Sequence, residues 1–228
     1  CVYNDIIDQK IDQKVRRTKF RQIASGKVSI CEAWVLAIFL SLLSLLILFQ
    51  FNLKAIIFGL SSGILIILYP FMKRITYWPQ LFLGIVFNWG VILSYLVFND
   101  KINLEISLIY FSAILWTLGY DTIYGLQDIY DDIRIGVKST SIKFKKNIKQ
   151  FLTTVYMLSF SLIFIVSILI TKETGIFFIF YLLPFFLLVY QIQSVEISKN
   201  KKNLSLFKLN NYYGLSIFLI QIFIFKYA

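Results

Sequence analysis

The sequence contains no histidine and only two cysteines, Cys1 and Cys31. The absence of histidine excludes Ser-His-Asp and Cys-His catalysis and every metal site that needs an imidazole ligand. The two cysteines predict neither a disulfide framework nor a zinc site. The chemistry that remains available is that of carboxylates, lysines, arginines and tyrosines.

Charged residues are scarce as well, at 15% of the 228 residues, whereas 58% of the residues are hydrophobic and 18% are aromatic. This composition excludes a soluble globular domain and is typical of a protein with several membrane spans. Since a helix needs roughly 20 apolar residues to cross a bilayer, we predict an all-α, multi-span transmembrane helical bundle in one membrane-embedded domain, residues 1–228. The seven predicted complete spans are 33–51, 55–72, 81–98, 104–120, 151–170, 175–195 and 206–225.

The formal net charge of +11 would suit a nucleic-acid-binding protein, but the distribution of the charge indicates membrane topology instead. If the segment before residue 33 is cytoplasmic, the inner loops hold nineteen lysines and arginines and the outer loops hold four. This asymmetry follows the positive-inside rule. We therefore expect a lipid bilayer, and no nucleic acid, as the partner of the chain, and an outer C-terminus.

Seven of the twelve carboxylates fall in two short clusters, each beside an apolar run on the predicted cytoplasmic side. Because each residue of a helix advances by about 100°, the polar residues of each cluster share one helix face. Carboxylates are costly beside a membrane and rarely accumulate there without a partner. The clusters comprise Asn4, Asp5, Asp8 and Asp12 in the first and Asp121, Asp128, Asp131 and Asp132 in the second.

Oxygen ligands that converge from rigid helices suit Mg²⁺, a hard ion that proteins usually bind through a few carboxylates and substrate phosphates. Basic loops follow both clusters, and their cations would neutralise phosphate oxygens. The pattern indicates a membrane enzyme that acts on a diphosphate ester through Mg²⁺ and keeps a long lipid tail among its apolar helices. Two alternatives stay open: acids that only solvate helix ends, and a divalent-cation transporter, although transporters place acids near the bilayer midplane.

Several ordered motifs resemble those of the UbiA superfamily of intramembrane prenyltransferases. The family motif N-D-x-x-D-x-x-x-D matches residues 4–12, and D-x-x-x-D matches Asp128 and Asp132. The strings at 69–80, 120–132 and 135–140 resemble in particular the branch that prenylates 4-hydroxybenzoate. Two positions depart from the pattern without removing a ligand: Gln22 stands where relatives usually have proline, and Gly125 where alanine is common.

The resemblance implies nine transmembrane helices around a central cavity, of which this chain would lack the first and most of the second. It implies that polyprenyl diphosphate binds through Mg²⁺ to both motifs and alkylates the ring carbon ortho to the hydroxyl of 4-hydroxybenzoate, a step of ubiquinone synthesis. Acceptors of the menaquinone, haem or tocopherol type are alternatives. The expected location is the bacterial or mitochondrial inner membrane, with the acidic motifs on the cytoplasmic or matrix side.

Carried over position by position, the resemblance also implies roles for single residues. The four implied catalytic carboxylates, which with Asn4 would also be the Mg²⁺ ligands, are Asp8, Asp12, Asp128 and Asp132. The implied substrate contacts are Arg17, Arg21, Tyr69 and Lys73 near the diphosphate, Arg74 near the benzoate carboxylate, and Asn4, Asp5, Asp121 and Tyr124. For the basic residues, topology alone would also place cations at these positions.

Overall fold

The structure, a computed structural model, describes residues 1–171, 176–197 and 199–227, without the side chains of residues 176, 177 and 225–227. Every regular element in these ranges is a helix, which confirms the predicted all-α class. The elements are α1 (Val2–Asp12), α2 (Ile30–Leu48), α3 (Leu53–Ile75), α4 (Pro79–Phe87), α5 (Trp89–Phe98), α6 (Leu104–Gly125), α7 (Ile129–Ile135), α8 (Thr140–Lys143), η1 (Lys145–Asn147), α9 (Ile148–Thr171), η2 (Ile176–Tyr181), α10 (Leu182–Ser194) and α11 (Asn200–Tyr227).

Five helical segments of the described chain are long and apolar enough to cross a membrane, and they contain or closely match the first five predicted spans. The sixth prediction begins at Gly175, outside the described residues, and its apolar helix Phe178–Ser194 is shorter than a full span. The seventh lies within α11, whose first half is polar. The chain is therefore an integral membrane protein with a multi-span helical bundle, while the predicted number of seven spans is only approximate.

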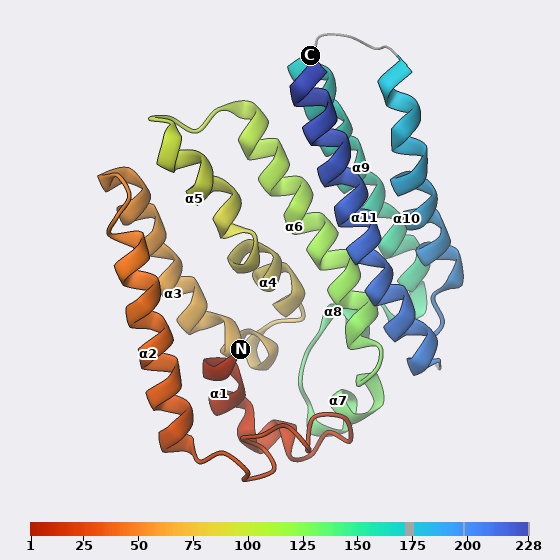
Figure 1. The fold of residues 1–228 in the computed structure, drawn as a ribbon. Coiled ribbons are helices and arrows are strands. Elements are labelled where there is room, and N and C mark those ends of the chain that lie inside the picture. The colour runs from red at the N-terminus through yellow and green to blue at the C-terminus, as the bar shows by residue number, and fades with distance from the viewer. Residues whose placement is uncertain (172–175, 198, 228) are drawn as a thin grey trace.

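The helices form an elongated bundle in which α6 lies centrally, between α3 with α4 and α5 on one side and α9 with α10 and α11 on the other (Figure 1). The short elements α1, α7 and α8 lie at one end of this bundle, whereas the α2–α3 and α5–α6 turns lie at the opposite end (Figure 1). The bundle thus brings the two acidic clusters, far apart in sequence, to the same end.

The central helix α6 packs most closely against α9. A glycine permits this approach, since a Cβ at Gly119 would lie only 2.2 Å from Cε1 of Tyr156. Tyr156 is fully buried, and its hydroxyl lies 3.1 Å from Oε1 of Gln191, as a polar group inside a bilayer requires a partner. This packing fixes the helix that leads directly into the second acidic cluster.

The third predicted span bends at Asn88, where α4 ends and α5 begins. The side-chain nitrogen of Asn88 donates to the carbonyl of Gly84 and to Oγ1 of Thr117 on α6, both at 2.8 Å. These bonds satisfy the amide within the apolar region and join α4 to α6. They hold the start of α4, at Pro79, close to the end of the bundle where the acids lie.

Candidate active site

Asp8 is the most deeply buried acid of the first cluster, with an exposed fraction of 1%. Its Oδ2 forms an ion pair of 2.6 Å with Nζ of Lys73 at the end of α3, and a nitrogen of Arg74 lies 3.6 Å from Oδ1. Oδ1 is buried and has no hydrogen-bond partner. Burial raises the pKa of Asp8 despite the attraction of Lys73. The structure therefore leaves one buried carboxylate oxygen open to a further positive partner.

The other two acids of the first cluster share a single cation. One nitrogen of Arg21 lies 2.8 Å from Oδ1 of Asp5 and 3.0 Å from Oδ2 of Asp12. Asp12 is buried, whereas Asp5 and Arg21 are partly exposed. Arg21 thus folds the loop that follows α1 back onto the helix that carries the acids.

The second acidic cluster spans the end of α6 and the start of α7. Asp128 directly precedes α7, and its two carboxylate oxygens accept hydrogen bonds from Nε of Arg17 at 3.0 and 2.9 Å. Another nitrogen of Arg17 donates to the Tyr124 hydroxyl at 2.7 Å. The carboxylate of Asp132 forms no hydrogen bond or ion pair with any described residue. Burial, together with the charge of Asp128, raises the pKa of Asp132 to about 7. The two acids therefore differ sharply, one paired and one free.

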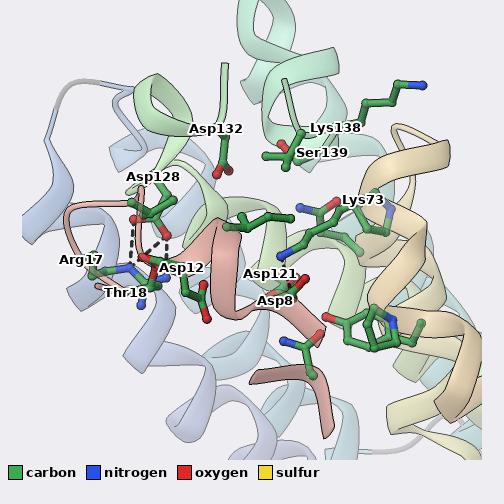
Figure 2. A pocket seen from close by; sticks show the side chains of 18 of the residues that line it. Asp8, Asp12, Arg17, Thr18, Lys73, Asp121, Asp128, Asp132, Lys138 and Ser139 are labelled. Carbon is green, nitrogen blue, oxygen red and sulfur yellow. Dashed lines mark hydrogen bonds and ion pairs between the residues drawn. The ribbon is translucent and has the colours of Figure 1, made fainter. Parts of the chain in front are cut away.

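One pocket at this end of the bundle is lined by residues of both clusters, and Figure 2 shows the labelled acids and Lys73 around it. Three predicted site residues, Asp5, Arg74 and Tyr124, do not line the pocket but contact residues that do. The predicted residues that line it are Asn4, Asp8, Asp12, Arg17, Arg21, Tyr69, Lys73, Asp121, Asp128 and Asp132. Segments about 120 residues apart in sequence thus form one polar cavity. The individual roles of these residues remain predictions.

Sequence reasoning did not assign four polar residues of the pocket wall to the site, namely Thr18, Gln80, Lys138 and Ser139. The backbone N–H of Lys138 donates to the carbonyl of Lys73 at 2.8 Å, so the loop after α7 lies against the end of α3. Gln80 belongs to the string 69–80, and Lys138 and Ser139 belong to the string 135–140, both of which resemble the family. The resemblance did not assign a role in the site to these three residues.

A preassembled metal site is not present among the described residues, because no three acidic or cysteine side chains gather closely enough to hold an ion. Arg17, Arg21 and Lys73 instead neutralise the carboxylates. The atoms available as metal ligands are nevertheless all oxygen atoms. Asp8 Oδ1 and the carboxylate of Asp132 accept no hydrogen bond from a described residue. Such a set fits a hard divalent cation such as Mg²⁺, once the cations turn toward a phosphate ligand.

Comparison with known proteins shows which family the chain represents. The model of the UbiA prenyltransferase family matches residues 1–212. A 4-hydroxybenzoate octaprenyltransferase of Pasteurella multocida is 34% identical over 223 residues, which cover 98% of this chain and 77% of that protein. The chain therefore belongs to the UbiA prenyltransferase family, as its motifs predict.

A mitochondrial 4-hydroxybenzoate polyprenyltransferase of Drosophila melanogaster is more similar over a shorter stretch, at 47% identity over 154 residues. This match covers 67% of the chain but only 39% of the fly protein. Among solved structures, the apo structure of a UbiA homolog from Aeropyrum pernix K1 superimposes with a TM-score of 0.81 at 24% identity, and covers 97% of this chain and 82% of that one. The structural match shows the fold.

Proposed function

We propose that the protein transfers a polyprenyl group from polyprenyl diphosphate to the ring carbon ortho to the hydroxyl of 4-hydroxybenzoate, in an Mg²⁺-dependent step of ubiquinone synthesis. The observation that supports this most strongly is the shared pocket, in which two acidic clusters meet the cations Arg17, Arg21 and Lys73 at one end of an apolar bundle. The names of the two curated relatives support 4-hydroxybenzoate as the acceptor.

The proposed role of the cations is to bind the diphosphate. Arg17, Arg21 and Lys73 all line the pocket, and each pairs with a carboxylate there. A diphosphate would take over these charge-assisted hydrogen bonds and leave the carboxylates free. Mg²⁺, held by Asp8, Asp12, Asp128 and Asp132 with Asn4, would stabilise the negative charge of the leaving diphosphate.

The proposed reaction breaks one bond and forms another without a net redox change. The bond between C1 of the prenyl group and the diphosphate oxygen breaks, and its electron pair leaves with the diphosphate. The ring carbon of the acceptor forms the new C–C bond with C1, and loss of the ring proton restores aromaticity. The apolar helices would hold the polyprenyl tail and keep water away from the allylic cation.

We also propose that residues 1–228 act as one membrane-embedded unit of a bacterial or mitochondrial inner membrane. The acidic end of the bundle would face the cytoplasm or matrix. The excess of lysine and arginine in the loops at this end supports the orientation.

The test is prenyl transfer in membranes that contain the protein at its full length, supplied with labelled 4-hydroxybenzoate, polyprenyl diphosphate and Mg²⁺. Product that disappears with EDTA and with Asp128→Ala supports the proposal. Product with a naphthoate, homogentisate or haem acceptor instead would keep the prenyl transfer and reject 4-hydroxybenzoate. Transport of divalent cations without transfer to any acceptor would reject the enzyme altogether.

A further inference from the structure

Gln80, the second residue of α4, is a buried polar residue of the pocket wall that takes no part in the ion pairs of the acidic clusters. Its exposed fraction is 6%, and it lines the same pocket as the acidic clusters. The side-chain oxygen of Gln80 accepts the backbone N–H of Thr140, at the start of α8, at 3.0 Å. The residue therefore connects α4 to the loop that follows the second acidic cluster.

This hydrogen bond determines which way the amide of Gln80 points. A backbone N–H can only donate, so the amide oxygen must face Thr140 and the amide nitrogen must point the other way. No described residue accepts a hydrogen bond from this nitrogen. Nε2 is also not one of the fully buried atoms without a partner among the described residues, so it stays accessible to water or to a ligand. The NH₂ group therefore provides the pocket with a fixed, neutral donor.

The surroundings of Gln80 hold the amide in place. A Cβ at Gly125 would lie 3.5 Å from Nε2 of Gln80 and 2.6 Å from Oγ of Ser141, so the end of α6 approaches the amide closely. Ser141 donates to the carbonyl of Thr122 at 2.7 Å, and the Thr122 and Thr140 hydroxyls lie 2.6 Å apart. These buried contacts join α6, α8 and the Gln80 side chain into one rigid wall.

The chemistry of this wall differs from that of the rest of the pocket. Pro79 and Val137 line the pocket together with Gln80 and offer apolar surface, and Ser139 adds a hydroxyl. The ammonium group of Lys138 instead donates to the carbonyl of Ile75 at 2.9 Å. An apolar surface with neutral donors is suited to an aromatic ring with one carboxylate. A diphosphate, with its higher charge, is suited to the side of Arg17, Arg21 and Lys73.

We propose that Gln80 binds the aromatic acceptor, donating a hydrogen bond from Nε2 to an oxygen of the acceptor carboxylate. The inference rests on the proposed function and assigns one further residue to it. Arg74, the residue predicted for this carboxylate, does not line the pocket, and its guanidinium donates to the carbonyl of Ile7 at 2.9 Å. Gln80 is therefore a contact separate from Arg74.

Gln80→Glu is the sharpest test, because a glutamate keeps an oxygen for the N–H of Thr140 but loses the NH₂ donor and repels a carboxylate. We expect the KM for 4-hydroxybenzoate, and its dissociation constant from equilibrium binding, to rise about tenfold or more. The KM for polyprenyl diphosphate should stay within about twofold. Gln150→Glu, which adds the same charge at an exposed position of α9, should leave both values unchanged.

Two further measurements separate recognition from a merely structural effect. Gln80→Met, of similar length and without charge, should raise the acceptor KM in the same direction by a smaller factor. In Gln80→Glu, the KM for 4-hydroxybenzamide should fall relative to the KM for 4-hydroxybenzoate, because the amide of 4-hydroxybenzamide can donate to the new carboxylate. An unchanged acceptor KM in both variants, or a change confined to polyprenyl diphosphate, would overturn the inference. Absence of transfer in the unmodified protein would instead count against the proposed function.

Discussion

Arg17 and Asp128, which lie 111 residues apart in the sequence, form an ion pair in which the guanidinium contacts both carboxylate oxygens. The guanidinium belongs to the loop after the first acidic cluster, whereas the carboxylate belongs to the second cluster. The pair therefore joins the two clusters directly, and it covers oxygen atoms that are predicted to bind Mg²⁺. Binding of metal and diphosphate would require Arg17 to exchange a carboxylate for phosphate oxygens.

Arg17→Gln is expected to weaken binding of polyprenyl diphosphate, with a rise in its KM of roughly tenfold or more. Arg17→Lys should recover only part of this loss, because an ammonium group cannot reproduce the forked geometry of a guanidinium. Arg16→Gln is the matched control, since Arg16 contacts the second cluster only through its backbone N–H to Asp131. Equal KM values for the Arg17 and Arg16 variants would contradict a role for Arg17 in diphosphate binding.

Asp8→Asn and Asp128→Asn are each expected to reduce prenyl transfer by at least about 100-fold, because each removes a charge from the site that stabilises the leaving diphosphate. Asn keeps the size of the side chain, so the protein should still accumulate in membranes. Asp100→Asn provides the control: this exposed acid pairs with Lys54 at 2.6 Å, outside the pocket. Initial rates in membranes with matched amounts of protein measure the effect. Transfer retained in either pocket variant contradicts the proposed site.

Chelation is expected to abolish transfer reversibly. EDTA should stop the reaction, and excess Mg²⁺ should restore it, since the pocket offers only hard oxygen donors among its acids. Ca²⁺ should restore less, because it demands more ligands and longer distances. The measurement is the initial rate of labelled product against free metal concentration. A rate that is insensitive to EDTA is inconsistent with a metal-dependent mechanism.

Lys73→Met is expected to destabilise the protein by about 3 kcal/mol, because it leaves the buried Asp8 carboxylate without its close partner. The double variant Lys73→Met with Asp8→Asn should recover much of that loss. Lys54→Met breaks an exposed ion pair of the same length and should cost far less, because solvent screens both charges. Unfolding of the detergent-solubilised variants measures these differences, and equal losses for the two lysines would contradict the burial argument.

We expect the contribution of Glu196, at the α10–α11 junction, to the stability of the fold to depend on pH. Hydrogen bonds from Lys202 and Lys199 lower its pKa from 4.5 to about 2. Because the folded pKa is lowered, the stabilisation is present above about pH 4.5 and is lost as the pH falls toward 2. The difference in melting temperature between the unmodified protein and Glu196→Gln should therefore shrink over this range. A difference that stays constant with pH would refute the assignment.

Long apolar runs made the helical bundle predictable, because backbone groups inside a bilayer must be satisfied within helices. The last two spans were less predictable. The sixth, 175–195, includes the 3₁₀ segment Ile176–Tyr181, and the polar start of α11 dilutes the apolar signal of the seventh. Composition along a chain does not reveal where a helix tightens or where polar residues of one helix find partners in another.

The two acidic clusters were identifiable because aspartates on one helix face beside a membrane require a partner. The pairing of individual acids was not identifiable. Asp8 with Lys73 and Asp128 with Arg17 are contacts between separate helices and loops, and they depend on how the bundle folds. The same holds for Tyr124, which contacts Arg17 but does not line the pocket.

The sequence by itself determined the helical membrane class, the family motifs and the presence of two acidic, phosphate-suited clusters, because hydropathy, charge and spacing are local properties of the chain. Only the tertiary structure decided that α6 and α1 bring these clusters into one pocket, that cations neutralise the acids there, and that Gln80 lines the same pocket with its amide oxygen bonded to the N–H of Thr140. Such properties arise from contacts between distant segments, whose directions are set by helix packing and by the need of every buried polar group for a partner.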